Sequence, residues 1–216
     1  KYDYRKDIES TGQRHLKRAE EHFKHITPLN LEISWGGGKG IVTHPPWVGF
    51  LDPEETNSPL RGIYLVYLLS KEKDYLNLSV GQGITDVEKK YGRGNSSQTI
   101  LKEDAIRLRA KLEEKNLKIP NQPMQLQSNG TRQKAYIAGS ISSIVYDCNN
   151  LPSETDLVND LQGMFRIYQH SIQAKRELLL TSPGEIRSPS PPNKQLNAIL
   201  QMDFKPKNSD EYRALI

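Results

Sequence analysis

The chain has 216 residues, of which 35% are hydrophobic and 26% are charged, so it can form one sizeable domain with additional segments. Lysine and arginine outnumber aspartate and glutamate by 30 to 26, a mild positive balance that favours anionic partners without identifying one. The single cysteine, Cys148, excludes a disulfide framework and a cysteine-based zinc site, and no run of 18 apolar residues is present to span a membrane.

The first predicted elements are a helix and two short strands. Residues 2–26 carry a partial apolar stripe at helical spacing, and Pro28 ends the helix. Residues 31–35 alternate between apolar and polar side chains, which predicts a half-buried strand, and Trp47–Leu51 is a second short strand. A glycine-rich loop separates the two strands.

The next part of the chain predicts the centre of a sheet. Residues 62–69 are nearly all apolar or aromatic, as expected for a strand buried on both faces. Residues 75–80 alternate cleanly and should pair with that strand as a hairpin. A short helical turn is expected over 86–91, followed by a flexible basic loop over 92–97.

The remaining elements are mostly helical. Residues 99–117 read as an amphipathic helix, whereas 119–132 is polar, contains prolines and has no period, which predicts a loop. Strand character returns over 135–146, with a break at the small residues Gly139 and Ser140. A long helix should then begin after Ser153, a predicted N-cap, and run to about Leu180.

Together these elements predict an α+β fold with a curved, mostly antiparallel sheet or partial β-barrel flanked by helices. Composition changes at Thr181, after which prolines lie among serine, glycine and arginine as in a linker. The chain begins at Lys1 rather than methionine, so we expect it to be part of a longer protein. The lone cysteine and the lack of a signal peptide predict a cytoplasmic location.

The glycine loop fails both common nucleotide-binding patterns. A Walker A loop would need a hydroxyl residue at position 40 and glycine at position 33, where the chain has Gly40 and Ile33. A dinucleotide fingerprint would need glycine at position 41, which is Ile41, and a helix after it.

The same loop has features that suit a nucleic acid. Backbone amides of Gly37 and Gly38 and the side chain of Lys39 suit phosphate oxygens. His44 and Pro45 complete the loop. The tryptophans that flank it, Trp35 and Trp47, could stack on a base taken out of the helix. A tight strand connection between two core tryptophans is the alternative reading.

Two further positions are candidates for DNA contact. Arg93 and Asn95 lie in the second glycine-containing loop, where they could hold phosphate or enter a groove, although a solvated surface loop has the same composition. Gln82 lies between two glycines at a strand end and could reach a base edge.

We predict no catalytic residue, metal site or cofactor within the chain. Residues 88–90 and 113–115 match the Glu-x-Lys end of a metal-dependent nuclease motif, but both lie in predicted helices without a well-placed aspartate. The five histidines form no zinc or nuclease pattern.

An ordered set of short motifs resembles the McrB-like N-terminal domain family, once classed as a domain of unknown function. The motifs are Gly36-Gly37-Gly38-Lys39-Gly40, Pro46-Trp47-Val48-Gly49-Phe50, Gly62-Ile63-Tyr64-Leu65-Val66-Tyr67-Leu68, Leu78-Ser79-Val80-Gly81-Gln82-Gly83-Ile84-Thr85 and Leu151-Pro152-Ser153 with Leu157, Asp160, Leu161 and Tyr168. The resemblance covers about residues 5–180.

The resemblance implies the recognition part of a type IV, modification-dependent restriction endonuclease acting in phage defence. Residues 1–180 would be the modified-DNA recognition domain, and 181–216 a linker and the start of a truncated downstream region, which the resemblance implies to be a nuclease. The implied partner is double-stranded DNA with a methylated base or a phosphorothioate backbone, without a membrane. A homodimer formed through the longer protein is left open.

Several mechanisms remain open from the sequence. Lys39, Arg93 and the loop amides would hold the DNA backbone, and Trp35 or Trp47 would line the pocket that reads the mark. A methylated base would be flipped into that pocket, whereas a backbone sulfur would need a small apolar pocket near Pro45. The two alternatives of another class are a metal-dependent nuclease within this chain and a protein-interaction module that binds no DNA.

Overall fold

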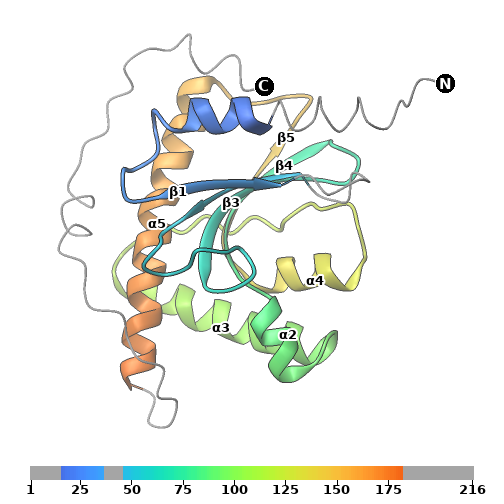
Figure 1. The fold of residues 1–216 in the computed structure, drawn as a ribbon, viewed down its shortest axis with the longest axis vertical. Helices are drawn as coiled ribbons and strands as arrows, with labels where there is room; N and C mark the ends of the chain where they lie inside the picture. The colour runs from blue at the N-terminus through green and yellow to red at the C-terminus, as the bar shows by residue number, and fades with distance from the viewer. Residues whose placement is uncertain (1–15, 37–45, 182–216) are drawn as a thin grey trace.

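The computed structural model describes residues 16–36 and 46–181, which form one antiparallel sheet with helices around it (Figure 1). The five strands follow one another in space in the order of the chain, and each is antiparallel to the next. They are β1 (Glu32–Gly36), β2 (Trp47–Leu51), β3 (Ile63–Leu69), β4 (Tyr75–Gln82) and β5 (Ser140–Asp147). The predicted α+β fold and the central place of β3 are confirmed.

The helices are distributed around this sheet rather than along one edge. One helix covers residues 16–23. The others are α2 (Thr85–Tyr91), α3 (Asn95–Glu114), α4 (Thr131–Ala138) and α5 (Glu154–Thr181). The predicted N-cap of the last helix is confirmed, because the Asp156 amide donates to Ser153 Oγ at 3.2 Å.

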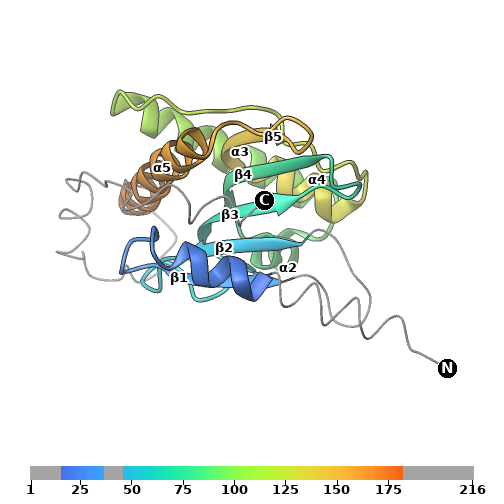
Figure 2. The same cartoon turned by 90° about the horizontal axis from the view of Figure 1, so that it is seen from above.

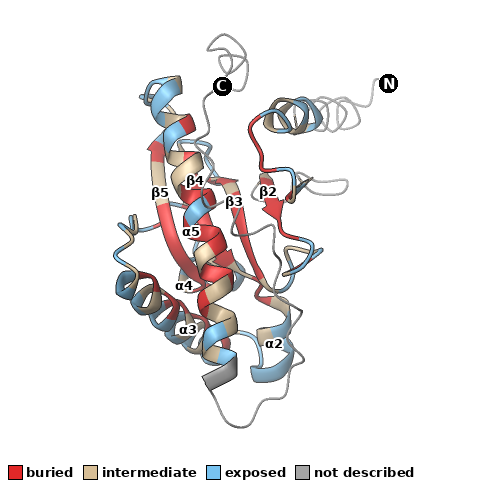
Figure 3. Cartoon of the chain, turned by 90° about the vertical axis from the view of Figure 1, so that its left-hand side faces the viewer, coloured by how far each residue is buried: buried red, intermediate tan, exposed pale blue. Residues whose placement is uncertain are grey.

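One face of the sheet packs against α5, α3 and the helix over 16–23. Ile63 and Leu65 of β3 point to this face and are 1% and 0% exposed. Phe50 lies at its centre, with its ring edge-to-face to Phe23 at 5.2 Å and to Phe165 of α5 at 5.1 Å. Figure 3 shows α5 lying across the strands with buried residues along its length. This face forms the main core.

The opposite face is covered by a segment without regular structure and by α4. Met124 and Leu126 of that segment pack with Tyr64, Val66 and Leu68 of the sheet. Figure 2 shows α4 and α5 on opposite sides of the sheet. Both faces of β3 are therefore buried, which explains its nearly continuous apolar sequence.

The same segment covers the outer edge of β5. The Gln122 amide donates to the Ser143 carbonyl, and the Ser143 amide donates to the Pro120 carbonyl, each at 3.0 Å. A strand edge with free backbone groups invites pairing with other chains. Residues 120–122 therefore protect this edge, in the region predicted as a loop.

The predicted boundaries around α3 and α4 are wrong. Residues 135–138 belong to α4 rather than to a strand, and β5 begins only at Ser140. Ala135 is buried against Ile84 and Leu101, and this packing selects a helix over the local strand preference. Residues 95–97 and 131–132 are predicted as loop but form the first turns of α3 and α4, and 115–117, predicted as helix, lie beyond the end of α3.

Candidate nucleic-acid interface

The glycine loop begins and ends at one point of the sheet. Gly36, the last residue of β1, is the register partner of Trp47, the first residue of β2. The candidates Gly37, Gly38, Lys39, His44 and Pro45 lie outside the described residues. The structure therefore defines the two strand ends, Gly36 and Trp47, that the loop connects.

The two tryptophans beside the loop lie on opposite faces of the sheet. Trp35 pairs with Val48 and Trp47 with Gly36, and successive residues of a strand point to opposite faces. Trp35 Nε1 donates to Glu20 Oε2 at 2.6 Å, on the face of the N-terminal helix. This hydrogen bond, followed by that from Lys24, lowers the pKa of Glu20. Trp35 is thus engaged in holding that helix, and the structure does not bring the tryptophans together.

The indole ring of Trp47 packs against the backbone at two glycines, Gly36 and Gly49. A Cβ added to Gly36 would lie 2.8 Å from Trp47 Nε1, and one added to Gly49 would lie 3.3 Å from Trp47 Cζ3. Any side chain at Gly36 would displace the indole. The sequence therefore places glycines where the ring needs space, in the same stretch as the loop.

Trp47 and Tyr136 are the two partly exposed aromatic residues of one apolar group, which we call the aromatic cluster. The buried members of the aromatic cluster are Leu51, Tyr64, Val66, Leu68, Met124 and Leu126. Burial raises the pKa of Tyr64, so its phenol stays protonated at neutral pH. Trp47 therefore lies at the foot of the glycine loop, whereas Tyr136 also packs with Ile84 and Leu101, toward the end of the sheet where Gln82 lies.

The other predicted site residues lie toward the opposite end of the sheet. Gln82 pairs with Ile63, whereas Trp47 pairs with Leu68, and five residues of β3 separate the two levels by roughly 17 Å. The side chain of Gln82 donates through Nε2 to the Leu101 carbonyl at 3.0 Å and to the Gly139 carbonyl at 3.3 Å. Its amide hydrogens are thus used inside the protein.

Arg93 and Asn95 are both accessible. The side chain of Arg93 is 83% exposed, with Nε 3.5 Å from Glu88 Oε2. Asn95 is exposed at the first position of α3. An exposed ion pair of this length contributes little to stability, so the Arg93 guanidinium can contact another anion.

Sequence reasoning missed two residues near the aromatic cluster. Tyr136 and Arg132 lie on α4, in a part of the chain predicted as loop and strand. Arg132 is exposed, and its charge acts to lower the pKa of Tyr64 against the larger effect of burial. The sequence did carry a signal for a basic surface in this region, because no aspartate or glutamate occurs between Glu114 and Asp147.

The Glu-x-Lys pairs lie where the sequence predicted them, on helices. Glu88 is in α2 beside Arg93, and Glu113 is near the end of α3. Among residues 16–36 and 46–181, no three His, Cys, Asp or Glu side chains gather as a metal site would require. Within the same residues, every helix is too short or too polar to cross a membrane.

One comparison with known proteins gives a match. The protein-family model described as "MrcB-like, N-terminal domain" matches residues 4–173, which include the whole sheet and most of α5. Neither the curated proteins nor the solved structures include a match to this chain.

Proposed function

The chain belongs to the MrcB-like N-terminal domain family, and on this premise we propose that it is the reader domain of a modification-dependent restriction endonuclease. The ligand proposed is duplex DNA that carries a methylated base or a phosphorothioate. Residues 1–180 would form the reader, and 181–216 would lead toward a downstream nuclease or motor region of a longer, cytoplasmic protein. A homodimer through that longer protein is part of the same proposal.

The observation that carries this proposal is the aromatic cluster at the foot of the glycine loop. A base displaced from its stack needs a ring to lie against, and Trp47 is half-buried where the glycine loop leaves the sheet. The apolar side chains of the aromatic cluster suit a methyl group or a sulfur atom, which make no strong hydrogen bonds. Lys39 and the loop amides would hold the neighbouring phosphates.

The test is a binding panel with one duplex sequence in five forms at stated salt, because salt alone changes DNA affinity greatly. The forms are unmarked, 5-methylcytosine, 5-hydroxymethylcytosine, N6-methyladenine and phosphorothioate. We expect one mark to bind more tightly than the unmarked duplex. Trp47→Ala should weaken binding of that form about 10-fold, since stacking of one base contributes about 1–3 kcal/mol.

Trp35→Ala is the matched control, because it removes the same side chain from the opposite face. It should leave the preference for the mark unchanged, and urea denaturation reports its separate effect on stability. Equal binding of all five duplexes would refute the reader function. Metal-dependent cleavage abolished by Glu88→Ala or Glu113→Ala would favour a nuclease. No binding of any duplex by the wild type would favour a protein-interaction module.

A further inference from the structure

Part of the chain lacks carboxylates to an unusual degree. The whole chain has 26 aspartates and glutamates in 216 residues, about one in eight, yet none lies between Glu114 and Asp147. About four would be expected in a stretch of that length. Four basic residues are present there, Lys115, Lys118, Arg132 and Lys134.

The fold lays the middle of this stretch across one side of the molecule. At one end the Lys71 amide, in the turn between β3 and β4, donates to the Leu126 carbonyl at 3.1 Å. At the other end the side chain of Gln98, in the first turn of α3, donates to the Thr131 carbonyl at 3.4 Å. We call residues 126–134 together with 92–98 the acid-free strip, because neither range contains aspartate or glutamate.

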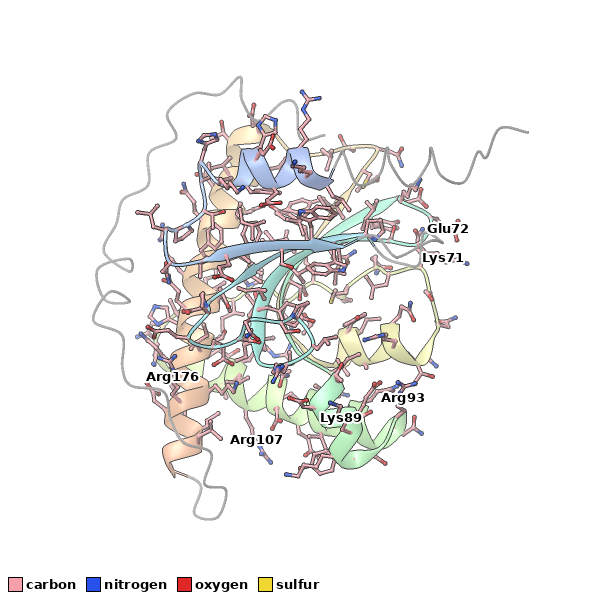
Figure 4. The ribbon with its side chains drawn as sticks, viewed as in Figure 1. Lys71, Glu72, Lys89, Arg93, Arg107 and Arg176 are labelled. Atoms are coloured by element: carbon pink, nitrogen blue, oxygen red, sulfur yellow. The ribbon has the colours of Figure 1, made fainter. Side chains whose placement is uncertain are left out.

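The charges on the acid-free strip are open to solvent. Arg132 and Lys134 are exposed, and within the described part of the chain neither has a carboxylate at ion-pair distance. The first turns of α3 and α4 contain no acidic residue, and carboxylates of other elements meet the acid-free strip at Gln127, whose Nε2 donates to Asp74 Oδ2 at 2.7 Å, and at Arg93, whose Nε is 3.5 Å from Glu88 Oε2. Figure 4 shows Lys71 and Arg93 on the side of the molecule where α4 lies and Arg176 on the other side.

The neutral residues of the acid-free strip also suit a polyanion. Asn95 and Asn129 are exposed amides, and Thr131 is an exposed hydroxyl. Side chains of these types, with arginine and lysine, make most hydrogen bonds to DNA phosphates and sugars.

The length of the acid-free strip fits several phosphates. It connects the two ends of β3, a strand of seven residues and therefore roughly 20 Å long. Phosphates of one DNA strand are spaced by about 3.4 Å along the helix axis. About six phosphates of one strand fall within that length of axis, and because the strand winds around the axis the acid-free strip can face only part of them. Arg132 lies at the α3 end of the strip, beside Tyr64 of the aromatic cluster.

We propose that the acid-free strip binds the phosphate backbone of the duplex whose modified nucleotide is held at Trp47, with Arg132, Lys134 and Arg93 contacting phosphates at the α3 end of the strip, away from that nucleotide. This inference rests on the proposed function. It assigns to Arg132, Lys134 and Arg93 an affinity that does not depend on the mark, and it leaves recognition of the mark to Trp47.

The experiment measures the salt dependence of binding to the preferred and the unmarked duplex. Arg132→Gln should reduce the slope of log K against log salt by about 0.9, because one phosphate contact is lost. From counterion release alone, affinity at 0.1 M salt should fall about 8-fold for both duplexes, so that their ratio is unchanged. The triple variant Arg93→Gln/Arg132→Gln/Lys134→Gln should reduce the slope by about 2.7.

Two variants control for net charge and for folding. Arg176→Gln removes one positive charge from the far side and should leave the slope unchanged, whereas Arg132→Lys should restore it. If the triple variant keeps the wild-type slope, or if Arg176→Gln lowers it equally, the assignment of the acid-free strip is wrong although the reader function stands. If the wild type binds no duplex at any salt concentration, the proposed function itself fails.

Discussion

Gly83 lies where two stretches of backbone touch. A Cβ at this position would be 2.1 Å from Arg61 Cα, and the Gly83 amide donates to the Gly62 carbonyl at 2.8 Å. The contact joins the end of β4 to the residues that lead into β3. No larger residue fits without moving one of the two backbones.

Gly83→Ala should therefore lower the free energy of unfolding by about 3 kcal/mol, the upper part of the range for overpacking. Gly163→Ala is the matched control, because nothing lies within 4 Å of the added Cβ in the middle of α5. It should raise stability by about 0.5–1 kcal/mol through helix propensity. Urea unfolding of both variants checks the prediction, and similar midpoints for the two would contradict the backbone contact.

At the scale of elements, the segment over 119–130 depends on one buried side chain. Asn77 of β4 is 0% exposed and donates through Nδ2 to the carbonyls of Leu68 at 3.2 Å and Gln125 at 3.0 Å. Its Oδ1 accepts from the Gln125 amide at 2.7 Å. One asparagine thus helps to hold the segment that contributes Met124 and Leu126 to the aromatic cluster.

Asn77→Ala should cost about 2–3 kcal/mol of stability, because it leaves buried backbone groups without partners. Hydrogen exchange of residues 122–127 should quicken before the rest of the sheet opens. Asn129→Ala, at an exposed amide in the same part of the chain, should change stability by less than about 0.5 kcal/mol. Unaltered exchange in Asn77→Ala would mean that the apolar contacts alone hold the segment.

At the scale of the whole molecule, buried tyrosines make the stability of the fold depend on pH in the alkaline range. Tyr64, Tyr146 and Tyr168 are 5%, 3% and 0% exposed, and burial raises the pKa of each above its usual value near 10. Tyr168 also accepts a hydrogen bond from the Asp52 amide at 2.8 Å, which ties α5 to the end of β2. The three lie on both faces of the sheet, so their ionisation reports on the whole core.

In the unfolded chain these tyrosines would lose their protons near pH 10, whereas in the folded chain they keep them to higher pH. Burial also raises the pKa of Tyr67. Stability should therefore be unaffected by these four tyrosines below pH 10 and should fall above it, by about 5 kcal/mol per pH unit for four groups. Urea midpoints between pH 8 and 11, together with tyrosinate absorbance, measure this fall. Tyr64→Phe should reduce the slope by about one quarter. Ionisation of all ten tyrosines near pH 10 without unfolding would contradict the burial.

Much of the architecture could be read from local sequence patterns. The bounds of β2, the central place of β3, its hairpin with β4 and the long helix after Ser153 were all predicted. Alternation, apolar runs and capping residues report on the immediate neighbours of a residue, and these elements are set by such neighbours. The resemblance carried by the short motifs identified the family that the comparison then showed.

The tertiary structure alone decided which of these elements meet. It placed Trp35 and Trp47 on opposite faces, because one step of register in a hairpin reverses the face of every side chain. It separated Gln82 from Trp47 along β3, and it made a helix of 135–138, whose packing partners Ile84 and Leu101 are distant in sequence. Register, face and long-range packing arise from contacts between segments far apart in the chain, so no local pattern contains them.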